Sequence, residues 1–540
     1  MTTTPIDQLT KAAERAPSAR LYYGEASCSY AELLDRSLRC ARGLDGLGIG
    51  AGDRVAFWLP NSIAYLELFF ACLHIGAIAV AVNTRFRTAE AESILSRTEA
   101  KALVLWPQFK DIPFAELLAA MDPAALKALE SVVVCGGDWP ARMQIDKRVV
   151  RHADLRGEEP VASRAAPELD CAIFATSGTT SAPKFAVHCQ GVVARHADMT
   201  AVVCGYDRPA THLLQAIPFC GIFGFSQMIA TVAGAASATL LDVFDPAEAG
   251  RLIRERGMHH VNGTDDLLKR LLDVYPAEQR PFPSLRHCVY AAFNPTLAEF
   301  PAEAERRGLH LIGAFGMTEV FSFVSLQPYD APLDIRKTSG GRLVNPAARV
   351  RARSRETGEV LPPGEVGGLE IGSDTLFRGY FRDPDATRAA FTEDGYFRTG
   401  DLGFTCADGA FRFLGRAGDF LRLGGFLVNP IEIEETLQQL DAAIETAVVV
   451  EVATERGNKP VAFVRLRSGH GFDEKVLRDR LKAVMADFKI PTCFIVVTTF
   501  PVAQGPNGEK IQRVKLKAMA TNAVAAKGQL ENPSSPVSLR

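Results

Sequence analysis

Helix and strand patterns alternate along most of the chain, and this alternation restricts the fold more than any other feature. Residues 29–48 have apolar positions at helical spacing, 53–59 form an apolar strand pattern, 62–75 a helix pattern and 77–83 a second strand pattern. The alternation resumes between residues 192 and 293. Strands that alternate with helices form a largely parallel sheet covered by helices. We therefore expect an α/β fold, with a large N-terminal domain of helix-covered sheets.

The pattern changes in the second half of the chain. From about residue 340, short strands with Gly and Pro turns indicate a small β-rich subdomain. A helix then begins near Pro430, followed by strand and helix patterns up to residue 500, and a compact α+β unit of about 100 residues is typical of a separate domain. We expect an N-terminal domain over 1–417, a mobile α+β C-terminal domain over 418–522 and a flexible tail over 523–540.

Composition limits the kind of partner. The 540 residues exceed what one hydrophobic core usually holds, and 47% hydrophobic with 23% charged residues is ordinary for a globular protein. A net charge of −3 provides no field for nucleic acid or anionic lipid, so a small-molecule partner is expected. The 11 cysteines form no CxxC pair, which argues against a disulfide framework and a structural zinc site.

The sequence also bears on location. The N-terminus has no basic region followed by an apolar core, so no signal peptide is expected. The apolar runs 68–82 and 221–241 are too short or too often interrupted by polar residues to cross a membrane, and each is typical of a buried helix leading into a buried strand. We expect a cytoplasmic protein, and the oligomeric state stays open.

Residues 176–188, TSGTTSAPKFAVH, concentrate hydroxyls, a glycine and a lysine directly after the apolar strand pattern 171–175. A loop at the end of a buried strand can present backbone N–H groups to an anion, and the lysine adds a point charge. This pattern predicts a grip for a polyphosphate. An ordinary turn is the alternative, because Ser, Thr, Gly and Pro also cluster in turns.

Further motifs follow along the chain. They are FGMTE at 315–319, TGD at 399–401, GR at 415–416 and NGEKIQR at 507–513. Together with SYAEL, GDRVAFWLPN and GAIAVAVN near the start, they make the chain from about residue 21 to 516 resemble the adenylate-forming superfamily of acyl-CoA synthetases, peptide-synthetase adenylation domains and luciferases. Each motif is weak alone, whereas the ordered set is specific.

The resemblance implies a two-step reaction. A carboxylate attacks the α-phosphate of MgATP to give acyl-AMP and pyrophosphate, and the thiol of coenzyme A then displaces AMP. Activation comes first because a free carboxylate has a poor leaving group, and bringing two anions together requires concentrated positive potential. ATP, Mg²⁺, coenzyme A and a carboxylic acid are the expected ligands.

By resemblance, Phe315 would stack on adenine, Thr318 would bond the α-phosphate and Glu319 would hold Mg²⁺. The alternative is a strand-end turn with one buried aromatic. Asp401 would accept both ribose hydroxyls with help from Arg416, and the alternatives are a turn cap and a surface ion pair. The β- and γ-phosphates would be cradled by Thr176, Ser177, Gly178, Thr179, Thr180 and Lys184.

The resemblance also implies roles in the C-terminal domain. Lys510 would reach the bond between the carboxylate and the α-phosphate; the alternative is a solvated lysine. The domain would swing about Gly418 to admit coenzyme A for the second step. Gly424 and Gly425 would then let the backbone approach the pantetheine arm, with an ordinary turn as the alternative.

Several residues depart from the family pattern. Ser181 and Phe185 stand where glycines are commoner, which predicts a stiffer phosphate loop. Gly418 stands where Asp or Lys is usual and cannot lock either pose by a side-chain contact. The sequence before Lys510 is GE rather than G alone, and Asp265 stands where a proline is common, a change that nothing in the sequence explains.

The acid pocket is expected around segment 217–225 and the strand before FGMTE. Amino-acid-activating relatives place an aspartate where Gly221 stands, and a buried substrate ammonium would lack a partner here. We therefore do not expect amino acids as substrates. By resemblance, glycine there also removes the His or aromatic gate that many relatives carry and leaves room for a ring or a medium chain, so an aromatic, alicyclic or medium-chain monocarboxylic acid is expected. Apolar residues at such positions are as often plain core. The candidate pocket residues are Met199, Gly221, Ile222, Phe223, Ala314, Phe321 and Ser322.

Two other function classes stay open: an acyl-AMP ligase that loads a carrier protein, and a binding protein that retains acid or nucleotide without turnover. The retention of Glu319, Asp401, Arg416 and Lys510 together argues against the second, because binding alone has no need of the lysine. No GxGxxG follows a strand and Gly-Lys occurs nowhere, which argues against a Rossmann dehydrogenase and a Walker-type ATPase. The adjacent His259 and His260 would point to opposite faces of a strand and are expected to be structural.

Overall fold

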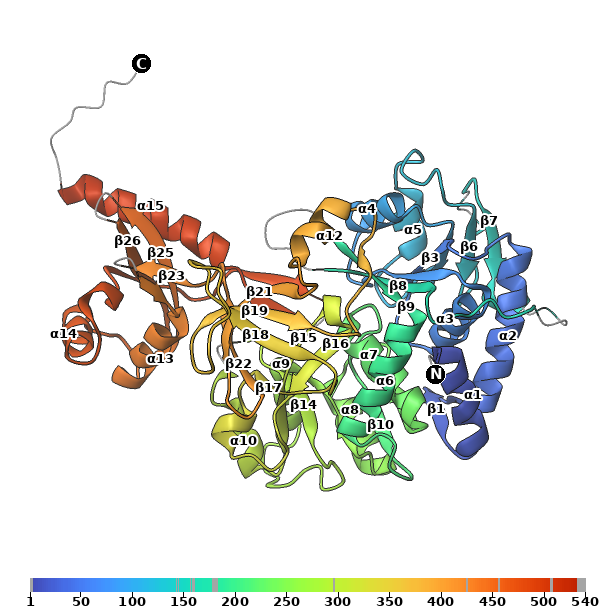
Figure 1. Cartoon of the computed structure of the whole chain (residues 1–540), viewed down its shortest axis with the longest axis horizontal. Coiled ribbons are helices and arrows are strands. Elements are labelled where there is room, and N and C mark those ends of the chain that lie inside the picture. The colour runs from blue at the N-terminus through green and yellow to red at the C-terminus, as the bar shows by residue number, and fades with distance from the viewer. Residues whose placement is uncertain are drawn as a thin grey trace, which may run out of the picture.

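The computed structural model describes residues 3–141, 143, 145–155, 157, 161–176, 183–294, 297–423, 426–454, 457–505 and 508–531. Among these, only the backbone is described at residues 422, 426, 427, 457, 503–505, 508–510 and 525–531. Most of the chain forms a large mixed α/β part, and the residues after about 420 form a smaller part at one end of the molecule (Figure 1).

The first sheet is largely parallel. Neighbouring strands from β8 to β7 are parallel, and β9 pairs antiparallel with both β8 and β20. Its central strands are short, apolar and buried, as expected for a sheet covered on both faces. The order is β20 (Gly379–Tyr380), β9 (Phe185–Cys189), β8 (Asp170–Ala175), β4 (Ile78–Ala81), β3 (Arg54–Trp58), β5 (Ala102–Leu105), β6 (Ser131–Val134) and β7 (Arg148–Arg151).

The second sheet is parallel except for the hairpin formed by β1 and β2. Its order is β12 (His260–Val261), β10 (His212–Gln215), β11 (Ser237–Leu240), β1 (Arg20–Tyr23) and β2 (Ala26–Ser29). One buried cluster joins this sheet to the first through helices α2 (Tyr30–Gly46), α3 (Ile63–Ile75) and α7 (Ile222–Gly234).

Helix α3 explains how the layers are held together. Every residue but Ala64 is buried, so the helix is apolar on all sides and not on one stripe only. Ser62 caps its start by accepting a hydrogen bond from the Tyr65 N–H, and Gly76 ends it in the left-handed conformation at φ 77°. The other helices of this part are α1 (Pro5–Arg15), α4 (Thr88–Thr98), α5 (Phe114–Ala119), α6 (Gln190–Cys204), α8 (Pro246–Arg256), α9 (Asp265–Asp273), α10 (Phe300–Arg306), α11 (Leu333–Arg336) and α12 (Pro384–Ala390).

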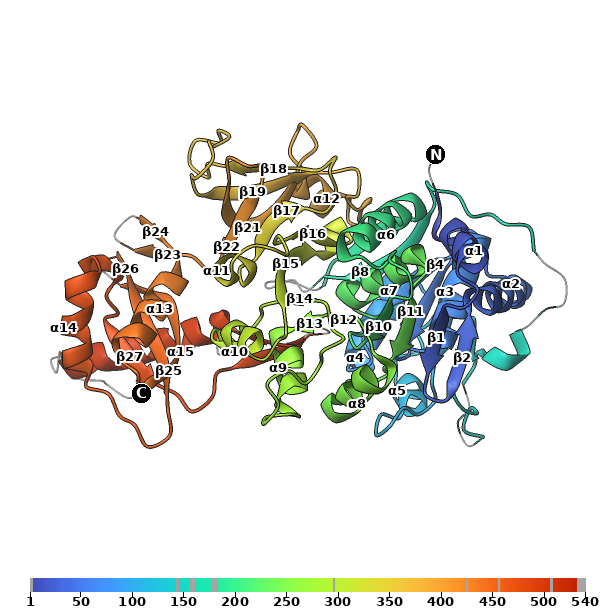
Figure 2. The ribbon, with the colours of Figure 1, turned by 90° about the horizontal axis from the view of Figure 1, so that it is seen from below.

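The third sheet changes from parallel to antiparallel along its width. The strands up to β15 are parallel and those from β15 onward are antiparallel. Figure 2 shows β17, β18, β19 and β21 in a lobe of their own, which is the predicted β-rich subdomain. The order is β13 (Gly263–Thr264), β14 (Cys288–Ala291), β15 (Leu311–Met317), β16 (Ser322–Leu326), β17 (Gly340–Leu343), β22 (Phe411–Arg416), β21 (Phe397–Thr405), β19 (Gly367–Gly372) and β18 (Arg349–Arg353).

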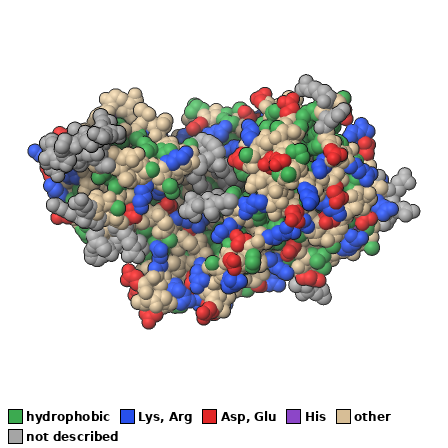
Figure 3. All heavy atoms as spheres, turned by 90° about the horizontal axis from the view of Figure 1, so that it is seen from above, with side chains coloured by type: hydrophobic (Ala, Val, Ile, Leu, Met, Phe, Trp, Pro, Cys, Tyr) green, Lys and Arg blue, Asp and Glu red, His purple; other side chains and the backbone are tan. Residues whose placement is uncertain are grey.

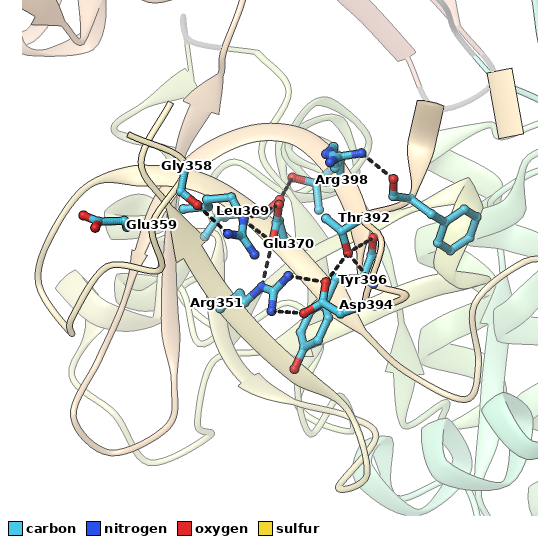
Figure 4. Close-up of polar contacts among 12 residues, drawn as sticks. Arg351, Gly358, Glu359, Leu369, Glu370, Thr392, Asp394, Tyr396 and Arg398 are labelled. Carbon is cyan, nitrogen blue, oxygen red and sulfur yellow. Dashed lines mark hydrogen bonds and ion pairs between the residues drawn. The ribbon is translucent and has the colours of Figure 1, made fainter. Parts of the chain in front are cut away.

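A charged network stiffens this lobe. The nearly buried carboxylate of Glu370 on β19 accepts from Arg351 at 2.6 Å and from Arg353 at 3.0 Å, both on β18. Arg351 also binds Asp394 and lies over the ring of Tyr396, 3.8 Å from its centroid (Figure 4). Because β19 is the direct neighbour of β21, the network supports the strand that carries Asp401.

The C-terminal part has its own core, formed by apolar residues between Leu421 and Ala520. Its elements are β23 (Leu421–Leu423), β24 (Phe426–Val428), α13 (Pro430–Leu440), β25 (Ile444–Thr454), β26 (Gly457–Leu466), α14 (Glu474–Val484), β27 (Cys493–Val496), the hairpin of β28 (Val502–Gly505) and β29 (Gly508–Ile511), and α15 (Arg513–Glu531). The expected boundary at Gly418 falls between β22 and β23.

The structure confirms the fold class. Runs 68–82 and 221–241 are a buried helix leading into a buried strand, and no helix among the described residues is long and apolar enough to cross a membrane. Residues 523–531, the first part of the predicted tail, continue α15, and the flexibility of the tail stays a prediction. This stretch is rich in good helix formers, and α15 is anchored upstream by the buried Leu516 and Ala520. Residues 532–540 lie outside the described part of the chain.

Candidate active site

A cavity of about 370 Å³ lies where the third sheet, the start of α7 and the C-terminal part meet. It contains residues from the predicted nucleotide, acid and lysine regions together. Its lining is formed by Ile222, Phe223, Ala291, Ala292, Phe293, Ala314, Phe315, Gly316, Met317, Thr318, Ser322, Phe323, Ser339, Asp401, Phe413, Arg416, Asp419, Ile511 and Arg513.

The FGMTE segment forms the end of β15 and the short turn after it, and both Phe315 and Thr318 line the cavity. Phe315 is mostly buried, and its ring packs against Phe411 and Phe413 at centroid distances of 5.3 and 5.1 Å. The chain then reverses into β16 through Phe321 and Ser322, which have φ values of 56° and 89°. Two consecutive non-glycine residues with positive φ are costly, and such backbone is found where the surroundings hold it in place.

Buried histidines pack behind this reversal. His188 and His196 lie edge-to-face on the ring of Phe321, at centroid distances of 5.0 and 5.4 Å. Nε2 of His196 contacts the carbonyl oxygen of Phe323 at 3.1 Å. Burial lowers the pKa of His188 to about 3 and that of His196 to about 4, so both rings are neutral at physiological pH. They act as packing groups that support the turn.

Glu319 and Lys184 meet at Tyr380. The Tyr380 hydroxyl donates to Oε1 of Glu319 at 2.9 Å, and Nζ of Lys184 lies 4.9 Å from the centroid of the Tyr380 ring. The Thr176 N–H donates to the Lys184 carbonyl oxygen at 2.8 Å, which closes the base of the phosphate loop. The loop itself, with the predicted contacts of Ser177, Gly178, Thr179, Thr180 and the departure at Ser181, lies outside the described residues.

The departure at Phe185 has a structural reason. Its side chain is buried in the core beside Ile173 and Val187, and the Arg97 guanidinium lies 4.5 Å from the centroid of its ring. Phe185 pairs with Ala175 at the ends of β9 and β8. The residue therefore anchors one end of the phosphate loop in the core.

Asp401 and Arg416 are direct partners across β21 and β22. Asp401 is 1% exposed, and its Oδ1 lies 3.1 Å from Nη1 of Arg416. Thr399 organises the pair, because its hydroxyl accepts from the Asp401 N–H at 3.0 Å and donates to the Leu369 carbonyl oxygen at 2.8 Å. The carboxylate is thus fixed at the cavity wall beside one mostly exposed guanidinium.

The C-terminal part reaches the cavity through Asp419, Ile511 and Arg513. Lys510 precedes Ile511 in β29 and pairs with Ala503 of β28; its side chain lies outside the described part. Arg513 is held by Glu434, with Nη1 to Oε1 at 2.8 Å, and by the Val449 carbonyl oxygen at 2.8 Å.

The structure describes the predicted hinge residue, Gly418, but not the two glycines predicted to lie beside the pantetheine arm. A Cβ built on Gly418 would meet nothing within 4 Å, so no space requirement fixes glycine at this position. Gly424 and Gly425 lie outside the described residues, and their predicted role stays a prediction.

Four of the seven candidate pocket residues, Ile222, Phe223, Ala314 and Ser322, line the cavity. The others do not. Phe321 is completely buried in the aromatic core behind it, because its left-handed backbone turns the side chain inward. Gly221 is the N-cap of α7, and Met199 packs against the neighbouring core.

Several lining residues were not anticipated from sequence. Ala291 ends β14, and Ala292 and Phe293 follow it at the same edge where β15 ends; the carboxyl ends of parallel strands commonly form ligand sites. That rule was a usable signal. Phe413, Ser339, Asp419 and Arg513 are brought to the cavity only by the antiparallel pairing and the placement of the C-terminal part.

Histidines and other potential metal ligands outside the cavity are accounted for by packing and ion pairs. His260 is buried beside His287, with ring centroids 4.7 Å apart, and burial lowers its pKa to about 2. Ligand atoms of Cys40, Glu67 and His152 lie within 4.8 Å of one another. In this cluster the nearly buried Glu67 is already paired with Arg36 at 3.4 Å and with His152 at 3.0 Å.

Side chains of opposite sign are interspersed on the face of the molecule shown in Figure 3, without a continuous basic surface.

Comparison with known proteins identifies the family. The model of the AMP-binding enzyme family matches residues 9–381, and that of the AMP-binding enzyme C-terminal domain matches 432–504. The chain is 30% identical over 481 residues to the 3-[(3aS,4S,7aS)-7a-methyl-1,5-dioxo-octahydro-1H-inden-4-yl]propanoyl:CoA ligase of Mycobacterium tuberculosis, covering 87% of this chain and 90% of that protein. It is 29% identical over 475 residues to the sulfoacetate–CoA ligase of Cupriavidus necator, covering 87% and 88%.

Solved structures of similar fold cover most of this chain. The anthranilate CoA ligase AuaEII in complex with anthranoyl-AMP is similar with a TM-score of 0.80 and 25% identity, over 97% of this chain and 98% of that one. ATP-bound MatB from Rhodopseudomonas palustris shares the fold with a TM-score of 0.81 and 24% identity, over 96% of this chain and 100% of that one. The chain therefore belongs to the AMP-binding enzyme family, within the adenylate-forming superfamily that its motifs resemble.

Proposed function

We propose that this enzyme, an AMP-forming CoA ligase, activates a ring-bearing or medium-chain monocarboxylic acid with MgATP and transfers the acyl group to coenzyme A. One observation carries the proposal. A single cavity is lined at once by Thr318, Asp401 and Arg416 and by the apolar residues Ile222, Phe223 and Phe323. An apolar acid and a nucleotide can therefore lie side by side within it.

The nucleotide end of the cavity suits ATP. We assign Asp401 to the ribose hydroxyls, because a buried carboxylate paired with Arg416, on a backbone held by Thr399, can accept hydrogen bonds without reorganising. Phe315 offers an aromatic surface for adenine. Thr318 and Glu319 provide a hydroxyl and a carboxylate, and Lys184, beside Tyr380, lies at the base of the loop assigned to the β- and γ-phosphates.

The donor set fits Mg²⁺, since Glu319 supplies a carboxylate that Tyr380 already orients. When bound, Mg²⁺ would neutralise phosphate charge and make the α-phosphate more electrophilic. Lys510, one residue before the cavity-lining Ile511, is assigned to the charge that develops as the carboxylate attacks the α-phosphate. The second step requires that Lys510 be withdrawn and coenzyme A admitted, for which Gly418 is the proposed pivot.

The apolar end of the cavity favours a ring-bearing or medium-chain acid. Phe223 and Phe323 pack edge-to-face at 5.2 Å, and Ala314 is small enough to leave room beside them. Among similar proteins, several are named for ring-bearing acids, including a 2-hydroxy-7-methoxy-5-methyl-1-naphthoate–CoA ligase and a 2-succinylbenzoate–CoA ligase. The sulfoacetate ligase takes a small dianion, and the apolar lining here disfavours such a substrate.

A panel of acids tests this proposal. Benzoate, anthranilate, a cycloalkyl propanoate, octanoate, sulfoacetate and phenylalanine would each be supplied with MgATP, with and without coenzyme A. We expect AMP and pyrophosphate release with the apolar acids, and thioester only when coenzyme A is present. Preference for sulfoacetate or phenylalanine would overturn the assigned substrate class. Acyl transfer to a carrier protein but not to coenzyme A would favour the acyl-AMP ligase alternative.

A further inference from the structure

The structure places the carboxylate of Asp265 in a buried position at the edge of the third sheet. Asp265 is the first residue of α9, directly after β13, and is 3% exposed. Its Oδ2 accepts two hydrogen bonds, from the Phe293 N–H at 3.0 Å and the Asn294 N–H at 2.8 Å. Its Oδ1 accepts from the Asp266 N–H at 2.9 Å.

Strand pairing explains why the two segments meet. β13 and β14 are parallel neighbours, with Thr264 beside Ala291, so their carboxyl ends lie at one edge of the sheet. Asp265 follows β13, and the loop 292–294 follows β14. The first residues of that loop, with the last residue of β14, supply Ala291, Ala292 and Phe293 to the cavity wall.

We propose that Asp265 is a positioning residue, which holds the loop 292–294 in place as a wall of the nucleotide-binding cavity. The inference rests on the proposed function, because it takes MgATP as the ligand. Here one buried carboxylate oxygen bridges two consecutive backbone amides, and charge-assisted bonds of this kind are the stronger ones.

The surroundings of Asp265 make its charge state measurable. Burial raises its pKa to about 6, against the opposing effect of the backbone N–H groups of Asn294, Asp266 and Phe293. The titratable groups that interact with it are Asp266 on its own helix, which raises its pKa further, and Tyr290 on β14. The Tyr290 hydroxyl donates to the Lys337 carbonyl oxygen, so it is already engaged elsewhere.

MgATP binding to the full chain, without acid or coenzyme A, tests the role directly by calorimetry. We expect Asp265→Ala to weaken the Kd for MgATP about tenfold and Asp265→Asn about threefold at pH 7.5, since asparagine keeps one acceptor oxygen. Asp266→Asn removes the same charge from the exposed neighbouring position and is expected to change the Kd less than about twofold.

The pH dependence separates positioning from mere folding. The asparagine side chain of the Asp265→Asn variant cannot ionise, so the ratio of its Kd to that of the unaltered protein should depend on pH. The ratio should fall from about threefold at pH 7.5 to about one at pH 5, where Asp265 is itself protonated. Should Asp265→Ala fail to fold, the nearly isosteric Asp265→Asn still decides the question. Unchanged affinity in Asp265→Asn, or a ratio independent of pH, would overturn the role of Asp265. Failure of the unaltered protein to bind MgATP would instead overturn the proposed function.

Discussion

The two sides of the cavity are built in contrasting ways. The side from the large part is tied into the sheet: Asp401 is bound through Arg416 and Thr399, and the strand beside it carries Glu370 between two arginines. The side from the C-terminal part brings Ile511 and Arg513 from a unit with a separate hydrophobic core. One wall is therefore fixed to the sheet, and we propose that the other moves as a body.

This difference suits a reaction in two steps. The nucleotide must stay bound while the acyl-AMP forms and then meets a thiol, so its wall has to be preorganised. The group that assists only the first step is better carried on a unit that can leave. The link between the two units is short: the Ala417 N–H donates to the Gly400 carbonyl oxygen at 2.9 Å, and the Asp419 N–H to that of Arg416 at 2.9 Å.

The largest expected effect comes from removing the positive charge of Lys510, a residue of the C-terminal part. Lys510→Ala should lower the rate of acyl-AMP formation about a thousandfold, because a preorganised positive group is lost where negative charge develops. Thioester formation from preformed acyl-AMP should stay within about threefold. Lys515→Ala, an exposed lysine on the following helix, is the matched control. Equal loss in both half-reactions would show that Lys510 is not specific to the first step.

The next largest effect is expected from weakening the attachment of the β28–β29 hairpin, which contains Lys510, to the rest of the C-terminal part. Arg513→Ala leaves the nearly buried Glu434 carboxylate without its guanidinium, and breaking such a pair costs about 3 kcal/mol of local stability. We expect faster hydrogen–deuterium exchange in peptides covering 444–466, with exchange in the first sheet unchanged. Glu435→Gln, at the exposed adjacent position, should leave exchange unaltered. An equal increase in both parts would contradict the view that they are separate units.

The fold was predictable where the pattern was periodic. The alternation of residues 29–104 predicted α2, β3, α3 and β4, because burial on both faces leaves a clear apolar signature. Four residues that the motifs singled out, Phe315, Thr318, Asp401 and Arg416, line one cavity.

The features that could not be predicted from the sequence depend on the local direction of the backbone and on pairing between distant segments. Phe321 follows the FGMTE motif, and no local pattern indicates that φ becomes positive there and turns its ring into the core. Asp265 was unexplained because its partners are the amides of Phe293 and Asn294, which approach it only through the pairing of β13 with β14. The hydrogen bonds of a buried carboxylate to distant backbone leave no periodic trace in the sequence.

A smaller effect is expected in the pH dependence of the free energy of unfolding, which tests the role of Asp265 on the side of the cavity formed by the large part. The pKa of Asp265 is raised from 3.8 in the unfolded chain to about 6, so the folded protein binds this proton more readily. The contribution to the free energy of unfolding is therefore greatest below pH 4, falls as pH rises to about 6 and is constant above. Asp265→Asn should remove this slope from urea-unfolding curves, whereas Asp266→Asn should retain it. A slope shared by all three proteins would place its origin elsewhere.

The smallest effect on stability is expected at the link itself. Since a Cβ at Gly418 would meet nothing within 4 Å, Gly418→Asp should change the free energy of unfolding by less than about 0.5 kcal/mol. Its consequence should be kinetic, because an aspartate at the pivot can contact one pose and not the other. We expect the ratio of acyl-AMP formation to thioester formation to shift, with Gly418→Ala as the control that adds a Cβ without charge. If both variants leave that ratio unchanged, the pivot lies elsewhere in the link between β22 and β23, and the contrast between the fixed and the moving wall would have to be traced to another residue.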